Sequence, residues 1–165
     1  MKLYFLIFSS LMLYFTACTQ TVNVSETETK NNITYLIGDT TPYTGIVESY
    51  YKADVLAYRS FYKNGLLNGL HTTYYGNGIK SMEVTYVNFY LNGPATYWYE
   101  NGQISAHGNY EHCSEDGLWV YYYENGNKKS EGYYLKGNKN GIWKFFHEDG
   151  SFMKSQEYKN GEVTQ

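Results

Sequence analysis

Short runs of alternating side chains, separated by glycine and asparagine, make up most of the chain. They are clearest at residues 118–123 (LWVYYY) and at residues 128–135 (KKSEGYYL). Successive side chains of a strand point to opposite faces of a sheet, so each run predicts one β-strand. Asn125 and Gly126 stand between the two runs, and Asn-Gly favours the positive φ angles of a type I′ turn. The pattern predicts a β-hairpin whose first strand is apolar on both faces.

This hairpin pattern recurs five times with a period of 24 residues and no insertion. Each unit has a leading glycine, an aromatic residue five positions later and a tyrosine 17 positions later. Four units carry a second glycine nine positions after the first, and Asp54 takes its place in the first unit. Several features held in register over five copies identify a repeat protein. The leading glycines are Gly45, Gly69, Gly93, Gly117 and Gly141, and the second glycines are Gly78, Gly102, Gly126 and Gly150.

The predicted fold is an all-β antiparallel meander of hairpin repeats, forming one elongated sheet of roughly ten strands of common length. A single hairpin is marginally stable in water, so each unit must gain stability from its neighbours. Looser Gly- and Asn-rich turns are expected between units. Residues 33–43 could add a first capping strand, which makes residues 33–165 the repeat domain. Its units are 45–68, 69–92, 93–116, 117–140 and 141–165.

The N-terminus resembles the signal sequence of bacterial lipoproteins. Lys2 precedes an apolar run from Leu3 to Phe15, which is too short to span a membrane and fits a secretory signal. The run ends in Phe-Thr-Ala-Cys at residues 15–18, which resembles a lipobox. The resemblance implies cleavage after residue 17 and acylation of Cys18, and several acyl chains would anchor the protein stably. A plain signal peptide, or an uncleaved anchor with an incidental cysteine, remains the alternative.

This resemblance places the protein in the bacterial cell envelope, lipid-anchored at the outer membrane and facing the periplasm or the outside. Residues 18–32 consist largely of Thr, Asn, Ser, Glu and Gln. Such a composition buries too little apolar surface to offset the entropy of ordering, so it predicts a flexible tether. If Cys18 is acylated, Cys113 is left without a disulfide partner in the chain.

Composition supports the all-β prediction and excludes one class of partner. The 165 residues include 21 tyrosines, 16 glycines and only two prolines, which suits short pleated strands joined by turns. The formal net charge is −3, and no basic stripe is present. Nucleic acid is therefore not an expected partner.

The recurring pattern G-[LI]-W-x-x-[YF]-x-E-[ND]-G resembles the second variant of the MORN repeat. It stands at residues 117–126 and again at 141–150, followed by E-G-x-Y at 131–134 and K-N-G at 159–161. The variant is known from YwqK-family antitoxins and from many bacterial lipoproteins. The resemblance covers residues from about 43 to 165. It implies a twisted antiparallel meander with a binding or scaffolding role, and no shared catalytic residues.

Candidate chemical groups do not recur with the repeat. His112, Cys113 and Asp116 fall in one inter-unit turn, which offers too few ligands for a typical zinc site. His71, His107 and His147 occupy three different repeat positions and are expected as surface strand residues. Glu100 and Glu124 precede hairpin turns and are expected to be solvated. We therefore expect no metal site, no cofactor and no enzymatic activity.

The aromatic ladders are the features with functional potential. Their simplest role is to form the core of the repeat array. The sharper hypothesis is that one row stays partly exposed and binds a protein partner, because tyrosine offers contact area at low entropic cost. Alternative hypotheses are an antitoxin-like module that holds a small toxic protein, and a binder of glycans or lipid head groups. The candidate partner-binding residues are Tyr51, Tyr75, Tyr99 and Tyr123, just before the tight turns.

Overall fold

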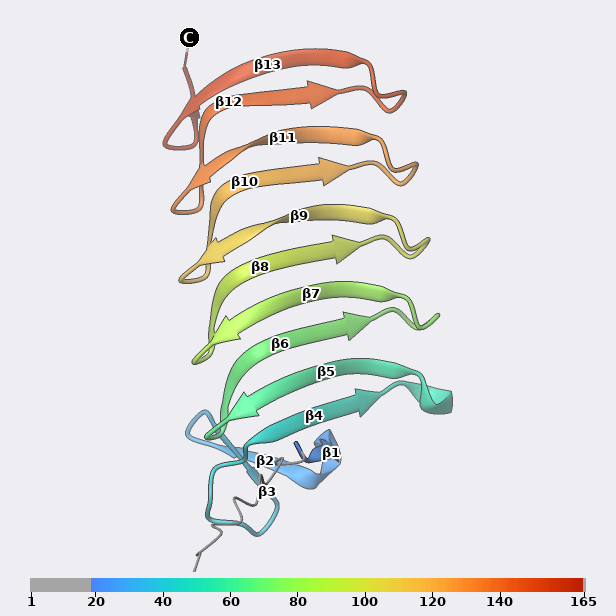
Figure 1. Ribbon diagram of the computed structural model, residues 1–165, viewed down its shortest axis with the longest axis vertical. Helices are drawn as coiled ribbons and strands as arrows, with labels where there is room; N and C mark the ends of the chain where they lie inside the picture. Colours follow the sequence, from blue (N-terminus) through green and yellow to red (C-terminus); the bar gives the residue numbers. More distant parts are fainter. Residues whose placement is uncertain (1–18, 165) are drawn as a thin grey trace, which may run out of the picture.

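The computed structural model of the protein describes residues 19–164, and the predicted signal peptide (1–17) and Cys18 lie outside the described residues. The five repeat units form ten strands, each antiparallel to the next (Figure 1). This arrangement confirms the predicted all-β hairpin meander. The strands are β4 (Gly45–Tyr50), β5 (Leu56–Lys63), β6 (Leu66–Tyr74), β7 (Lys80–Val87), β8 (Tyr90–Trp98), β9 (Ile104–Glu111), β10 (Ser114–Tyr122), β11 (Lys128–Leu135), β12 (Asn138–Phe146) and β13 (Phe152–Lys159).

Two further strands bring this sheet to twelve. β1 (Thr21–Asn23) pairs parallel with β4, and β14 (Glu162–Val163) pairs with the end of β13. β2 (Thr27–Lys30) and β3 (Ile33–Leu36) form a separate two-stranded sheet beside the N-terminal end of the array. Two short 3₁₀ turns, η1 (Val24–Glu26) and η2 (Lys52–Asp54), complete the elements. Among residues 19–164, no helix has the length and apolar character needed to cross a bilayer.

The structure differs from the predicted tether and from the predicted capping strand. Residues 21–30 are ordered in β1, η1 and β2, and the strand that covers β4 is β1. The predicted capping segment, residues 33–43, contributes β3 to the small sheet instead. The physical reason is one apolar side chain: Val22 is buried against Val47 and Tyr43, although the segment around it is polar. The average composition of residues 18–32 is polar, so it gave no sign that one valine of this segment would be buried.

Three-residue loops close the hairpin within each unit, where the sequence predicts type I′ turns. In the second unit, the N–H of Gly78 donates to the carbonyl of Tyr75 (2.9 Å), and the N–H of Tyr75 donates to the carbonyl of Ile79 (2.8 Å). Positive φ occurs at Gly78 (82°) but not at Asn77. The Asn77 side chain instead accepts a hydrogen bond from the N–H of Ile79 (3.0 Å). The Asn-Gly dipeptide therefore builds a turn with one left-handed residue, its glycine.

Type I′ geometry occurs in the connections between units. Both residues of each connection have positive φ, for example Lys136 (50°) and Gly137 (80°). Glycine or asparagine is the usual choice at such positions. Phe89 (76°) and Cys113 (66°) stand at the second position in two of these turns, and a bulky residue is uncommon there. In Figure 1 these turns lie along the left edge of the sheet and the three-residue loops along the right edge.

The core of the array lies on one face of the sheet, which we call the tryptophan face. Trp119 and Trp143 are 2% and 0% exposed, although no second layer formed by residues 19–164 covers them. Each indole lies over a glycine: a Cβ on Gly108 would come within 2.2 Å of the Trp119 ring, and one on Gly132 within 2.4 Å of the Trp143 ring. Tyrosine rings of adjacent strands close over the indoles, and Phe145 covers Trp143 from the same strand. The burial of both tryptophans thus depends on glycines that let the rings lie flat on the sheet.

The ends of the sheet are protected in different ways. At the N-terminal end, β1 covers β4, and the Tyr43 hydroxyl donates a hydrogen bond to the carbonyl of Gln20 (2.9 Å) or of Ile46 (3.0 Å). At the other end, β14 pairs only with Tyr158 and Lys159, which leaves the rest of β13 as an edge. Lys154 and Glu157 on that edge are exposed, and charged side chains discourage pairing with another strand.

Candidate functional site

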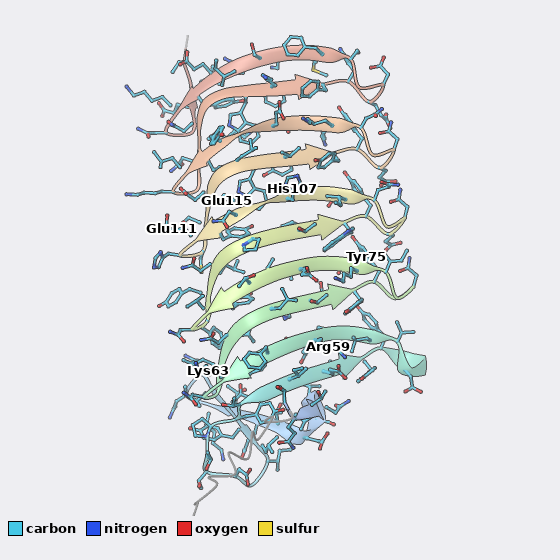
Figure 2. All side chains as sticks on the ribbon, in the orientation of Figure 1. Arg59, Lys63, Tyr75, His107, Glu111 and Glu115 are labelled. Carbon is cyan, nitrogen blue, oxygen red and sulfur yellow. The ribbon has the colours of Figure 1, made fainter. Side chains whose placement is uncertain are left out.

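The four tyrosines proposed to bind a partner form a row of ties between neighbouring units. The hydroxyls of Tyr75, Tyr99 and Tyr123 donate to main-chain carbonyls of the next unit, at 2.6, 2.7 and 2.9 Å. Tyr51 makes the same bond, 3.0 Å long, from a more exposed position. Figure 2 shows Tyr75 at the edge formed by the three-residue loops. These side chains are therefore part of the repeat framework, because their polar groups already have partners.

Asparagines of the loops reinforce the same ties. The side-chain amides of Asn77, Asn101 and Asn125 donate to the main-chain carbonyls of Glu100, Glu124 and Glu148, at 3.0, 2.9 and 2.7 Å. The two glutamates predicted as turn residues, Glu100 and Glu124, are exposed and serve here through their backbone. Each loop thus holds the following loop at a fixed spacing.

His71 differs from the surface position expected for it. It stands two residues after its leading glycine, where the fourth and fifth units carry tryptophan, and lies between the rings of Tyr58 (6.0 Å) and Tyr86 (5.9 Å). Its Nδ1 is 2.7 Å from the hydroxyl of Ser60, and burial lowers the pKa of the imidazole. Ser60 is only 1% exposed, so its hydroxyl is buried beneath the half-buried imidazole. The repeat position of His71 was the signal that could have placed it on the tryptophan face.

The other proposed chemical groups lie apart from one another. His112 and Cys113 occupy an exposed type I′ turn, and Cys113 is a free thiol. His107 contacts Tyr122 on the opposite face, with 3.2 Å between the ring nitrogen and the hydroxyl. Over residues 19–164, histidine, cysteine, aspartate and glutamate do not gather into a group of three that could hold a metal ion.

Exposed apolar side chains gather on the face opposite the tryptophans. Leu118, Tyr133, Leu135 and Ile142 are 45–62% exposed and lie on β10, β11 and β12. Leu118 and Tyr133 are direct cross-strand partners. We call these four residues the outer strip. Leu70 has the same repeat position as Leu118 and Ile142 but lies four strands away from Leu118, on β6.

The tryptophan face carries a groove of about 420 Å³ in its C-terminal half. Tyr121, Tyr134, Trp143 and Phe145 line it, together with Ser130 of β11. Ser130 pairs with Tyr121 on one side and with Phe145 on the other. A small side chain between two large rings leaves this space open.

The family model of the MORN repeat variant matches five consecutive segments: residues 43–64, 67–88, 91–112, 115–136 and 139–160. Each begins two residues before a leading glycine. The chain belongs to the MORN repeat family. A comparison with the curated proteins found no match.

Membership accounts for the regularity of the ties described above. The second, third and fourth MORN units each supply one tyrosine and one asparagine bond to the next unit, at an interval of 23 residues. The first MORN unit departs most from this scheme, because η2 replaces the glycine loop at Asp54 and the φ of Asp54 is 59°. The outer strip and most of the lining of the groove lie in the last two units.

Replacing Tyr99 by Phe should lower the free energy of unfolding by about 1 kcal/mol, because it removes one hydrogen bond and leaves a carbonyl without its donor. Tyr133→Phe is the matched control, since this exposed tyrosine has no side-chain hydrogen bond in the structure and should lose little stability. Urea unfolding followed by circular dichroism measures both. Equal midpoints for the two variants would contradict a stabilising role for the tyrosine ties.

Stability should also depend on the protonation of His71. Because burial lowers the folded-state pKa of this histidine, its stabilising contribution is complete above the ordinary value of 6.5 and is lost as pH falls through the lowered pKa. Hydrogen bonds from Tyr50 and Arg59 lower the pKa of Glu48 from its ordinary value of 4.5. Protonation of Glu48 therefore reduces the free energy of unfolding only below about pH 4.5, which lies outside the pH range of the measurement. Unfolding free energies measured from pH 8 to 5 should fall for the native protein and stay flatter for His71→Gln. The same slope in both proteins would refute this role.

Proposed function

We propose that this MORN protein is a non-catalytic, membrane-anchored lipoprotein of the cell envelope that binds another protein through its repeat sheet. The single observation that carries the binding part is the outer strip. It presents four large apolar side chains on a face that nothing in residues 19–164 covers. Exposed apolar patches of this kind are typical of protein interaction sites.

The lipobox-like residues 15–18 support the anchor. The ordered chain begins close to it: the carbonyl of Gln20 already accepts a hydrogen bond from the N–H of Ile46 (2.8 Å), and β1 begins at Thr21. Three residues reach at most about 11 Å when fully extended. An acyl group on Cys18 would therefore hold the N-terminal end of the sheet close to the surface of the outer membrane. The sheet would lie either on the periplasmic face of that membrane or on its outer face.

This geometry leaves the C-terminal units farthest from the anchor. The outer strip lies on β10–β12, well up the stack of strands from β1 (Figure 1). A protein partner could approach it without meeting the membrane. The strip combines Tyr133 with aliphatic side chains, and aromatic residues are enriched at protein interfaces.

The anchor predicts a clear effect of Cys18→Ala. The native protein should remain with the membrane after an alkaline wash and incorporate labelled fatty acid, and the variant should do neither. Cys113→Ala is the control, because it removes the other cysteine and should leave both properties unchanged. Fatty-acid labelling or tight membrane attachment of Cys18→Ala would refute the lipoprotein proposal.

The outer strip predicts which substitutions abolish partner capture. Residues 19–165, immobilised as bait for envelope and soluble fractions, should retain one partner at a fixed ratio. Leu118→Glu with Ile142→Glu should weaken that capture at least tenfold, which corresponds to about 1.4 kcal/mol, because two charges would be buried in the interface.

Leu70→Glu is the matched control for that double variant. It introduces one glutamate at the same repeat position, in place of an exposed leucine outside the strip. Circular dichroism should show the same sheet in all three proteins. Capture that survives the double substitution, or that Leu70→Glu abolishes equally, would contradict binding at the strip.

A further inference from the structure

The lysines on the two faces of the C-terminal units have different surroundings. On the outer face, Lys128 and Lys144 both pair with Glu131, at 2.7 and 3.8 Å. On the tryptophan face, Lys129, Lys139 and Lys154 have no carboxylate within salt-bridge distance among residues 19–164. The same short stretch of sheet thus pairs its lysines with a carboxylate on one face only.

The unpaired lysines lie against aromatic rings around the groove. The Lys139 ammonium is 4.2 Å from the centre of the Trp143 ring and 5.2 Å from that of Tyr158. Lys129 stands over Tyr123 at 5.5 Å. Such cation–π contacts hold an ammonium in place without neutralising its charge. Partial burial lowers the pKa of Lys139, so its charge is costly there and gains most from an anionic partner.

The groove itself combines positive charge with apolar and hydroxyl groups. Lys129 and Lys139 line it beside the aromatic side chains, and no carboxylate does. Burial and the hydrogen bond with Tyr134 raise the pKa of the Tyr121 phenol, and the negative charge of Glu115 adds to this, but Glu115 does not line the groove. The hydroxyls of Tyr121 and Tyr134 are 3.3 Å apart. One hydrogen bond joins them and uses one of their two protons, so the other can be donated to a ligand.

The spacing of the two lysines indicates the length of the ligand. Lys129 lies at the start of β11, and Lys139 is the cross-strand partner of Tyr134, five residues farther along β11. Five strand residues span about 17 Å. In an extended peptide, residues i and i+4 point to the same side and lie about 14 Å apart, a distance that two lysine side chains can bridge.

We infer that this groove binds an extended acidic peptide segment, with carboxylates at positions i and i+4 held by Lys129 and Lys139 and an apolar side chain at i+2 lying between Tyr121 and Phe145. The site is separate from the outer strip, because it lies on the opposite face of the sheet. Its ligand is defined by charge and spacing, whereas the strip is defined by apolar contact.

The test uses the purified full-length protein and two fluorescein-labelled peptides, Glu-Ser-Phe-Ser-Glu and Gln-Ser-Phe-Ser-Gln. Fluorescence anisotropy should show saturable binding of the first peptide and at least tenfold weaker binding of the second. The affinity should fall as salt rises, because partly exposed ion pairs are screened. Equal affinity for the two peptides, or no saturable binding of either, would overturn the inference.

Variants locate the site on the sheet. Lys139→Gln and Lys129→Gln should each weaken binding of the acidic peptide roughly tenfold, and Lys139→Arg should retain it. Lys144→Gln is the matched control on the same strand but the outer face, and the double variant of the outer strip is the second control. Neither control should change the affinity. An equal loss with Lys144→Gln would overturn the assignment to the groove.

A third ligand separates peptide from sugar recognition. Aromatic grooves can also stack against sugar rings, so chitotriose is titrated in parallel under the same conditions. Weak or absent binding of chitotriose is expected, since charge governs the site. Binding of chitotriose that persists in both lysine variants would assign the groove to sugar rings and overturn the inference.

Discussion

The contact between an indole ring and a glycine on the neighbouring strand is the constraint on which the rest of this structure depends. A single-layer sheet has no opposing layer, so it can bury large side chains only by laying them along its own surface. Trp119 and Trp143 do this because Gly108 and Gly132 leave the space beneath them free. Adjacent rings such as Tyr134, 5.0 Å from Trp143 and nearly perpendicular to it, then cover the indoles. The same indole–glycine contact therefore buries the tryptophans and joins neighbouring strands.

The size of the buried side chain at the tryptophan position changes along the array. The position of Trp143 is taken by Val47, His71 and Ala95 in the first three units. These smaller side chains bury less area, and the N-terminal end is completed by a second cluster that includes Val22 and Tyr43. The segment before the repeats is therefore part of the folded unit, since β4 would otherwise present both an open edge and an uncovered Val47.

The sequence predicted the hairpin meander and its period well, because glycine spacing and side-chain alternation report on local backbone geometry. The prediction of the turn type was wrong because an asparagine can take two different roles in a turn. Asn77 could occupy a left-handed turn position or accept a hydrogen bond from the N–H of Ile79, and only the structure shows the second. The hydrogen bonds of the tyrosines before the loops were missed for a similar reason. Alternation placed them in one row but could not show that the hydroxyl of Tyr99 reaches the carbonyl of Tyr122 (2.7 Å). The groove, in turn, depends on the small side chain of Ser130 between rings that lie far apart in the sequence.

The constant repeat length has a consequence for how such proteins can change over generations. Internal units meet their neighbours through the same pairs of positions, as the cross-strand pairs Arg59–Thr72 and Glu131–Lys144 show. Duplication of one 24-residue stretch of the gene would add two strands, and about 10 Å of length, without disturbing either end. Because the two faces are built from alternate residues, such an event would lengthen both surfaces together, and later point substitutions could then specialise each face on its own.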